Sequence, residues 1–382
     1  MPSTKKLAKR IVWSMNMKDR ETVLIRGGVH EQKLIEEIAL QALKQGNEPM
    51  LSTSSDNFIE NIYKDIPIKY LKRTPKISMK LAEVLDNVIS LEKPKDPRIM
   101  EKVEHEKIAA LSEARKPVSE KMDKEEVKWC AVGYPSEELA EKLGVKLKTL
   151  KKFILNGMLV DHEKLLEKSK AIKDKLKGLS NVHIYDNHGT DLTLKMGKRK
   201  IMCSDGYISS QDKREDDIGN NLPDGEVFTT PIETEGNGTL YSPKRTDIFT
   251  GKMIEGITLV FEDGKLNLKK TRAEKNEDVL INTLKHAIRI DKKKSHALRT
   301  TSPAELGIGL NDYITDVIGY LLTDEKVTKT CHVAIGKNKN PAYGGKSESV
   351  IHWDFVTKQG VNIDGFKDGK KVEILKKGKV VK

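Results

Sequence analysis

The chain has 382 residues, more than one hydrophobic core usually organises, so we expect two domains. Hydrophobic residues make up 37% of the chain and charged residues 33%, which is typical of a globular protein with a Lys-rich surface. No apolar run is long enough for a membrane span, the basic N-terminus lacks a signal-peptide pattern, and three scattered cysteines exclude a disulfide framework. We therefore expect a cytoplasmic protein that has no membrane partner.

The formal net charge of +12 raises nucleic acid as a possible partner. However, the lysines are interleaved with Glu and Asp, and aromatic residues make up only 5% of the chain. No stretch combines a basic cluster with the aromatic side chains that stack on single strands. We therefore interpret the basic runs 291–299 and 375–382 as solvated surface, and nucleic acid is not the favoured partner.

The first part of the chain predicts a parallel α/β layer. Residues 6–16 have helical apolar spacing, and a short strand at 21–26 ends at Gly27-Gly28. An amphipathic helix is expected at 31–45 and a second strand at 49–53. Strand, helix and strand in this order are typical of a parallel sheet. Neither GxGxxG nor GxxxxGK[ST] occurs, so we interpret the Gly-Gly pair as a turn rather than a nucleotide site.

The region up to residue 178 continues with helices and one strand. The expected elements are a Lys/Glu-rich helix, a strand, a helix capped by Ser136 and two more helices, at 102–124, 127–132, 136–144, 145–159 and 164–177. The last helix is heavily charged and is expected to bridge two domains. We place the boundary near Gly178, so that residues 1–178 form an α/β N-terminal domain.

The second part of the chain changes to short strands and turns. Strands are expected at 182–185, 192–196, 257–261, 266–270, 331–336 and 350–356. A helix is expected at 276–288, and Asp-Gly turns at 263–264, 364–365 and 368–369. Residues 179–382 are therefore predicted to form a β-rich α+β domain.

Two strands near the C-terminus bring potential metal ligands together. Residues two apart on a strand point to the same face, so His352 and Asp354 are expected to project side by side. His332 joins them if its strand pairs with theirs across the Gly-rich connection 340–349. Two imidazoles and a carboxylate are typical of a metal site, although a His-x-Asp by itself is also a common surface pair.

Two glutamates upstream extend this set. Glu226 follows a Pro-Asp-Gly turn at the start of a strand, and Glu305 opens the apolar, Gly-containing stretch 304–311. Alone, either glutamate is equally compatible with an exposed loop. Together with the two imidazoles and Asp354 they exceed the needs of one catalytic zinc, and suit two divalent ions bridged by a carboxylate. Such a pair of ions suits hydrolysis of a peptide bond next to an N-terminus.

These stretches resemble the thermophilic metalloaminopeptidase family, the group that contains aminopeptidase T and aminopeptidase S. The resemblance is collinear over nearly the whole chain. It covers KLAKRIVWSMNMKDRETVLIRG at 6–27, YPSEELAEKLGVKLKTLKKFI at 134–154, GTDL at 189–192, NLPDGEVFTTP at 221–231, ELGIGLN at 305–311, HVAIG at 332–336 and IHWDF at 351–355.

The resemblance implies a homodimeric, two-domain metalloenzyme whose C-terminal domain, residues 179–382, binds the metals and is catalytic. Such an enzyme releases N-terminal amino acids from short peptides with two divalent ions (Zn, Co or Mn). The family's metal-binding residues fall on Glu226, Glu305, His332, His352 and Asp354. Glu305 is implied as the catalytic carboxylate, acting either as a bridging ligand or as a general base.

The chain departs from the family pattern at the catalytic tyrosine. The family places this residue seven positions after the first His, where this sequence has Lys339. The nearest tyrosine is Tyr343, eleven positions after His332, across an apparent insertion at 337–342. If the loop brings Tyr343 to the metals, its hydroxyl could stabilise a tetrahedral oxyanion.

Two other functions remain open. The scaffold also resembles a ring-cleaving dihydroxypyridine dioxygenase, for which His332, His352 and Asp354 would hold a single Fe(II). A non-enzymatic binding protein is the third hypothesis, motivated by the positive charge. The sequence does not define the preferred N-terminal residue or the metal, nor whether a metal or a carboxylate such as Glu233 or Glu235 anchors the substrate amine.

Overall fold

The computed structural model describes residues 1–294, 299–340 and 343–381. The basic run 291–299 and the insertion 337–342 therefore lie partly outside the described residues. Contacts divide the chain into two units: unit 1 contains residues 1–159 and 206–223, and unit 2 contains residues 160–205 and 224–382. Within the described ranges, no helix combines the length and apolar character needed to cross a membrane.

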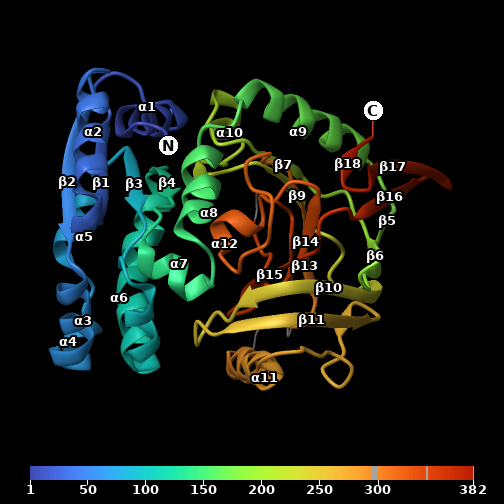
Figure 1. The fold of residues 1–382 in the computed structure, drawn as a ribbon. Helices are drawn as coiled ribbons and strands as arrows, with labels where there is room; N and C mark the ends of the chain where they lie inside the picture. Colours follow the sequence, from blue (N-terminus) through green and yellow to red (C-terminus); the bar gives the residue numbers. More distant parts are fainter. Residues whose placement is uncertain (295–298, 341–342, 382) are drawn as a thin grey trace. The chain divides into compact units, whose positions relative to one another are not determined.

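Unit 1 is built on a five-stranded sheet in which every neighbouring pair is parallel (Figure 1). In spatial order the strands are β2 (Glu48–Ser54), β1 (Thr22–Gly28), β3 (Asn87–Leu91), β4 (Lys128–Val132) and β8 (Gly219–Leu222). β1 and β3 are buried over most of their length, as expected for inner strands of a parallel sheet. The predicted parallel α/β layer is confirmed.

The α-helices of unit 1 include the long ones expected from apolar spacing. They are α1 (Thr4–Ser14), α2 (Gln32–Leu43), α3 (Asp56–Asp65), α4 (Ile68–Leu71), α5 (Lys76–Leu81), α6 (His105–Lys124), α7 (Glu137–Leu143), α8 (Leu147–Lys151) and α10 (Ser210–Arg214). The predicted cap is confirmed, because Ser136 Oγ accepts the N–H of Leu139 at 3.0 Å. Gly144, with a φ of 65°, ends the same helix in the left-handed region.

The inner strand β3 is present in the structure but was not predicted from the sequence. It lies between β1 and β4, yet its sequence is only five residues long and flanked by charges. A strand buried on both faces has no alternation of polar and apolar residues that would separate it from a short helix. β8 was not predicted either, because residues 206–223 return to unit 1 after the chain has already entered unit 2.

Unit 2 contains two antiparallel sheets. The eight-stranded sheet runs in the order β12 (Lys265–Leu266), β11 (Met253–Glu262), β10 (Gly236–Thr246), β6 (Asp191–Lys195), β5 (Asn181–Tyr185), β16 (Asn362–Lys367), β17 (Lys370–Lys376) and β18 (Lys379–Val380). The five-stranded sheet runs in the order β15 (His352–Val356), β14 (Thr330–Gly336), β13 (Pro303–Gly309), β9 (Glu226–Thr229) and β7 (Ile201–Ser204). Side chains of both sheets share one hydrophobic core.

The helices of unit 2 are α9 (His162–Leu176), α11 (Glu277–Lys293) and α12 (Leu321–Asp324). Helix α9 buries Leu165, Ile172 and Leu176 in the core of unit 2. The contact division therefore begins unit 2 before α9, whereas the sequence prediction ends the N-terminal domain after it, at residue 178. The apolar stripe of α9 is short and its other face is charged, so the sequence alone does not show which core it covers.

The Asp-Gly turns behave differently from one another. Asp263-Gly264 connects β11 to β12, and Asp368-Gly369 connects β16 to β17, as predicted. The predicted turn at Asp364-Gly365 is wrong, because both residues lie inside β16. A Cβ on Gly365 would lie 2.6 Å from Leu179 Cδ1, so this glycine permits close packing rather than a turn. The strand predicted at 266–270 ends at Leu266, because the side chain of Asn267 accepts the next backbone N–H groups.

The buried carboxyl group of Glu31, in unit 1, is expected to make the free energy of unfolding depend on pH. Its side chain is buried, Oε2 accepts the N–H of Gly28 at 2.6 Å, and Oε1 has no hydrogen-bond partner among the described residues. Burial raises the pKa of Glu31 to about 8 from an ordinary 4.5. The folded state therefore favours the protonated acid. Its contribution to stability is fully present below the ordinary pKa of 4.5, and it is lost as the pH rises through the folded-state pKa of about 8.

Glu31→Gln is therefore expected to flatten the pH dependence of the free energy of unfolding. The amide keeps the hydrogen bond to Gly28 and carries no charge at any pH. Between pH 5 and pH 9 the wild type should lose roughly 2–4 kcal/mol more than the variant. Urea unfolding at both pH values measures this difference, and parallel losses in the two proteins would contradict the assignment.

Candidate metal centre

The five predicted metal ligands lie on one face of the five-stranded sheet of unit 2. In β13 and β14 the register pairs Gly307 with His332, and in β14 and β15 it pairs Ala334 with Asp354. Glu305 of β13 also pairs with Ala334 of β14. His352 of β15 pairs with Gly336 of β14, and Glu226 of β9 pairs with Gly309 of β13. Paired residues of antiparallel strands point to the same face, and so do residues two apart. Four neighbouring strands thus converge on one patch, and the predicted pairing of β14 with β15 is confirmed.

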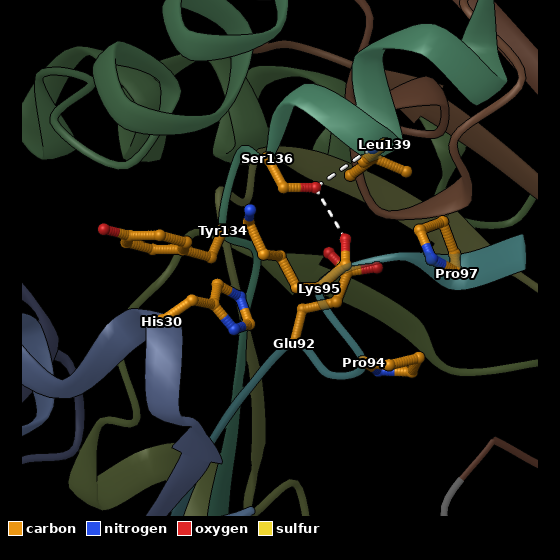
Figure 2. Close-up of a pocket in the computed structure, with 8 residues that line it drawn as sticks. All are labelled: His30, Glu92, Pro94, Lys95, Pro97, Tyr134, Ser136 and Leu139. Carbon is orange, nitrogen blue, oxygen red and sulfur yellow. Dashed lines mark hydrogen bonds between the residues drawn. The ribbon is translucent and has the colours of Figure 1, made fainter. Parts of the chain in front are cut away.

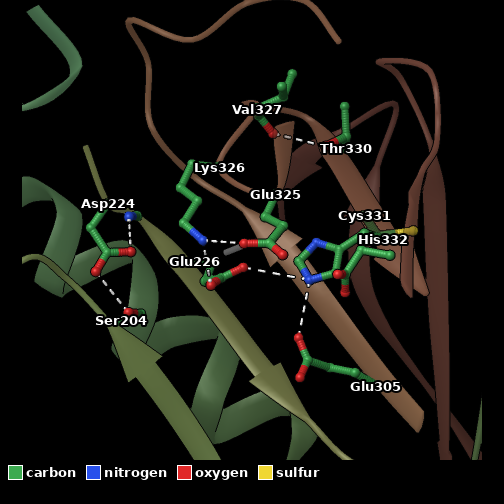
Figure 3. A network of polar contacts seen from close by, with 12 residues as sticks. Ser204, Asp224, Glu226, Glu305, Glu325, Lys326, Val327, Thr330, Cys331 and His332 are labelled. Carbon is green, nitrogen blue, oxygen red and sulfur yellow. Dashed lines mark hydrogen bonds and ion pairs between the residues drawn. The ribbon is translucent and has the colours of Figure 1, made fainter. Parts of the chain in front are cut away.

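Glu305 lies between two groups of ligands. On one side, Glu305 Oε1 is 3.2 Å from His332 Nε2, which is also 3.5 Å from Glu226 Oε2 (Figure 3). On the other side, Glu305 Oε2 is 3.9 Å from His352 Nε2, which is 3.2 Å from Asp354 Oδ1. The ligand atoms of Glu305, His352 and Asp354 all lie within 4.8 Å of one another, a spacing that a single metal ion could span. Each oxygen of Glu305 therefore faces a different imidazole.

Several buried polar atoms in this cluster lack hydrogen-bond partners. Within the part of the chain that the structure describes, they are Glu226 Oε2, His332 Nδ1 and both carboxylate oxygens of Asp354. Burying polar atoms without partners is costly. Carboxylate oxygens and imidazole nitrogens are ligands that Zn²⁺, Co²⁺ and Mn²⁺ accept, so the residues present fit divalent cations.

The ring orientation of His352 also suits metal binding. Its Nδ1 lies 2.7 Å from the backbone oxygen of Lys337, which can only accept a hydrogen bond. In the neutral imidazole that binds a metal, Nδ1 therefore carries the proton, which leaves the lone pair of Nε2 facing Glu305 and Asp354. A hydrogen bond that fixes the tautomer from behind is typical of metal-binding histidines.

The pKa shifts show that the cluster attracts positive charge. Burial raises the pKa of Glu226 to about 8, despite the nearby ammonium of Lys326. Burial opposes protonation of His332, yet the hydrogen bond to Glu305 and the charge of Glu226 raise its pKa to about 9. The pKa of His352 is likewise raised well above its usual value, because the charge of Asp354 outweighs burial. Bound divalent cations would satisfy the same negative charge.

Gly307 makes room for His332. A Cβ at this position would lie 2.1 Å from both Cε1 and Nε2 of the imidazole, which is completely buried. Gly307→Ala is therefore expected to push the ring from the ligand position and to weaken divalent-metal affinity by about 10- to 100-fold. Isothermal titration with Zn²⁺ measures this change.

The neighbouring Ile308 provides a control for Gly307→Ala. Ile308 points to the opposite face of β13 and lies in the hydrophobic core. Ile308→Val should cost about 0.5–1.5 kcal/mol of stability and leave metal affinity unchanged. Equal metal affinities in Gly307→Ala and Ile308→Val would show that the ring does not depend on the glycine.

Sequence reasoning missed two charged residues beside the ligands, Glu325 and Lys326. The Lys326 side chain is completely buried, and its Nζ lies 2.9 Å from Glu226 Oε1 and contacts Glu325 Oε2 (Figure 3). Both residues follow α12 in the segment Thr-Asp-Glu-Lys, whose run of charges resembles an exposed loop. The buried ammonium of Lys326 is stabilised by Glu226, which is distant in sequence, and by Glu325, which is adjacent to it. Neither pairing produces a recognisable sequence motif.

Tyr343 lies near the same face of the sheet. Its ring packs edge-on against Phe228, with the ring centroids 5.5 Å apart. Phe228 pairs with Gly307, which pairs in turn with His332. Lys339, at the position of the family tyrosine, is instead exposed and paired with Glu348.

The two carboxylates considered for anchoring a substrate amine are occupied differently. Glu233 is buried, with Oε2 3.0 Å from Arg199 Nη2 and Oε1 accepting the N–H of Lys346 at 2.6 Å. Both of its oxygens are therefore engaged within the protein. Glu235 is exposed and lies 3.9 Å from Lys195 Nζ.

A separate small cavity lies in unit 1. It is lined by His30, Glu92, Pro94, Lys95, Pro97, Tyr134, Ser136 and Leu139 (Figure 2). These residues follow β1, β3 and β4, at the edge of a parallel sheet where ligands commonly bind. However, its volume of about 10 Å³ is room for a single water, so it does not compete with the metal centre as a substrate site.

The chain belongs to the thermophilic metalloprotease (M29) family, whose family model matches residues 2–380. Its fold is similar to that of wild-type AmpT from Thermus thermophilus, with a TM-score of 0.78, 18% identity and coverage of 99% of both chains. It is also similar to 2,5-dihydroxypyridine dioxygenase from Pseudomonas putida KT2440, with a TM-score of 0.60, 14% identity and coverage of 99% of this chain and 96% of that chain. No curated protein sequence matches the chain. The family resemblance expected from the sequence is confirmed, and the mixed α/β architecture matches the AmpT fold.

Proposed function

We propose that this chain is a metal-dependent aminopeptidase that releases N-terminal amino acids from short peptides with two divalent ions. The family supports a metalloprotease, and the fold similarity to AmpT supports the aminopeptidase. The observation that carries the two-metal proposal is the position of Glu305, which directs one oxygen to His332 and the other to His352.

The ligands divide into two positions that share Glu305. Glu226 and His332 would hold one ion, and His352 and Asp354 the other. When bound, the pair of ions would supply Lewis acidity and lower the pKa of a shared water. Lys326 holds Glu226 Oε1, so that Oε2 is left to face His332.

The protein groups around the ions have distinct tasks in this proposal. Glu305 would serve as a ligand at both ion positions, or it would accept the proton of the attacking water. The Tyr343 hydroxyl donates a hydrogen bond to the oxyanion that forms as the peptide carbonyl becomes tetrahedral. Because Glu233 is engaged by Arg199 and Lys346 and Glu235 is exposed, we propose that neither carboxylate anchors the substrate amine.

A panel of short peptides with different N-terminal residues tests the function. The metal-loaded protein should release free N-terminal amino acids, EDTA should abolish the release, and Zn²⁺, Co²⁺ or Mn²⁺ should restore it. A folded protein that carries two ions and releases nothing from a broad panel would contradict the proposal. We also propose a cytoplasmic homodimer in which unit 2 is catalytic, and light scattering of the purified protein tests the dimer.

A single-iron, ring-cleaving oxygenase is the second candidate function. It is favoured by the fold similarity to 2,5-dihydroxypyridine dioxygenase and by the three ligands His332, His352 and Asp354. Glu226 and Glu305, which face His332 from two strands, exceed what such a site needs. One iron per chain and cleavage of a dihydroxypyridine would support this candidate over the peptidase.

A further inference from the structure

Two oppositely charged side chains are buried beneath the segment that connects β14 to β15. Arg199 follows β6, and Glu233 follows β9. Their side chains are only 9% and 3% exposed, and Arg199 Nη2 lies 3.0 Å from Glu233 Oε2. We call this pair the Arg199–Glu233 clamp.

Each member of the clamp also bonds the backbone of the connecting segment. Arg199 Nη1 donates to the backbone oxygen of Gly344, and Glu233 Oε1 accepts the N–H of Lys346 at 2.6 Å. The two bonded backbone groups belong to Gly344 and Lys346, which lie one and three residues after Tyr343. Gly344 has a φ of 77°, a left-handed conformation that glycine adopts without strain.

The clamp therefore holds the backbone just after Tyr343, whose ring lies near the face of the sheet that carries the candidate ligands. The Tyr343 ring packs on Phe228, which is two residues from Glu226 on β9. Thr230 Oγ1 also lies 3.4 Å from the backbone oxygen of Tyr343. A buried ion pair adds little net stability over a hydrophobic pair, so its particular contribution is to fix the groups that it bonds. Reactive groups on loops need such support to keep their geometry.

We propose that Arg199 and Glu233 are positioning residues that hold Tyr343 at the metal centre through Gly344 and Lys346. The inference rests on the proposed peptidase function and on the role of Tyr343 within it. Neither Arg199 nor Glu233 is a proposed metal ligand or is expected to touch the substrate.

A double-mutant cycle with Tyr343 tests this positioning role. Tyr343→Phe should lower kcat by about 100-fold with little change in KM, because one oxyanion donor is lost. Arg199→Met should lower kcat by about tenfold or more, through misplacement of the same hydroxyl. In the Tyr343→Phe background, Arg199→Met should cause no further loss, because the group that it positions is already absent.

Conservative and control variants separate positioning from general destabilisation. Arg199→Lys keeps a charge that can pair with Glu233, but its single nitrogen replaces the two that Arg199 directs to Gly344 and Glu233. It should therefore retain more kcat than Arg199→Met. Asp364→Asn removes a similarly buried carboxylate that pairs with Lys371 at 2.8 Å on β16 and β17, and it should leave kcat unchanged. Metal content should be the same in all of these proteins.

Binding of a dipeptide phosphinate, a mimic of the tetrahedral state, gives a readout that does not depend on turnover. Its Kd should rise by a similar factor in Tyr343→Phe and Arg199→Met, and it should not change in Asp364→Asn. If the wild type is active, a full loss of kcat in Tyr343→Phe with no loss in Arg199→Met would contradict the positioning role. Additive losses of kcat in the double variant would also contradict it. A wild type that holds two ions but neither releases amino acids nor binds the phosphinate would instead overturn the peptidase function.

Discussion

Glu305→Gln is expected to lower the rate of amino-acid release by about 10³-fold or more, because either proposed role, ligation of the ions or proton transfer, requires the carboxylate. The amide keeps the shape of the side chain, but it removes the charge that both His332 and His352 face. Only one of its terminal atoms remains an acceptor, so it cannot bridge two ions. Steady-state kinetics on a dipeptide, with metal in excess, measure the loss.

Glu235→Gln is the matched control for this variant. Glu235 is an exposed glutamate of the same unit, and its nearest charged partner is Lys195 at 3.9 Å. Surface pairs of this kind contribute little, so the control should keep its activity. Activity of Glu305→Gln within tenfold of the wild type would contradict both roles proposed for Glu305, as a metal ligand and as a general base.

Lys326→Met is expected to destabilise the metal-free protein by about 3–5 kcal/mol, because it leaves buried carboxylates without their partner. The ammonium lies 2.9 Å from Glu226 and also contacts Glu325, and its side chain is completely buried. Saturating Zn²⁺ or Co²⁺ should recover a large part of the loss, since a cation at the Glu226 and His332 position supplies the missing charge. Thermal unfolding with and without metal measures both effects.

A buried lysine of unit 1 shows whether that recovery is specific. Lys128 is 1% exposed and pairs with Glu21 at 2.9 Å within unit 1, whereas the proposed ligands belong to unit 2. Lys128→Met should also lower the Tm, and metal should not restore it beyond the shift seen in the wild type. Equal metal rescue of the two variants would contradict the proposed link between Lys326 and the metal centre.

The candidate ligands could be predicted because strand periodicity is simple. The spacing of His352 and Asp354 places both on one face, and the Gly-rich connection predicts a pairing with the strand of His332. By themselves Glu226 and Glu305 are weaker predictions, which the family resemblance strengthens, because a glutamate after a turn has no sequence feature that separates a ligand from an exposed residue. The structure adds the reason for their convergence, which is the register through Gly309, Gly307 and Ala334.

Other parts of the fold depend on distant contacts. Lys326 is buried only because Glu226, a hundred positions earlier, comes beside it, so its charge pattern alone predicts a surface loop. β3 lacks alternation because both of its faces are covered, and residues 206–223 rejoin unit 1 without any change in composition. The Arg199–Glu233 clamp likewise joins segments that follow different strands, and no local pattern marks it.

Metal stoichiometry tests the central proposal most directly. Metal-free protein is dialysed against Zn²⁺ or Co²⁺, and the bound metal per chain is measured by elemental analysis in the wild type and in His352→Ala. We expect two ions per wild-type chain and a loss of at least one in the variant, because His352 and Asp354 hold one of the two positions. A single ion per wild-type chain at saturation, above all a single iron, would contradict the two-metal peptidase and favour the oxygenase.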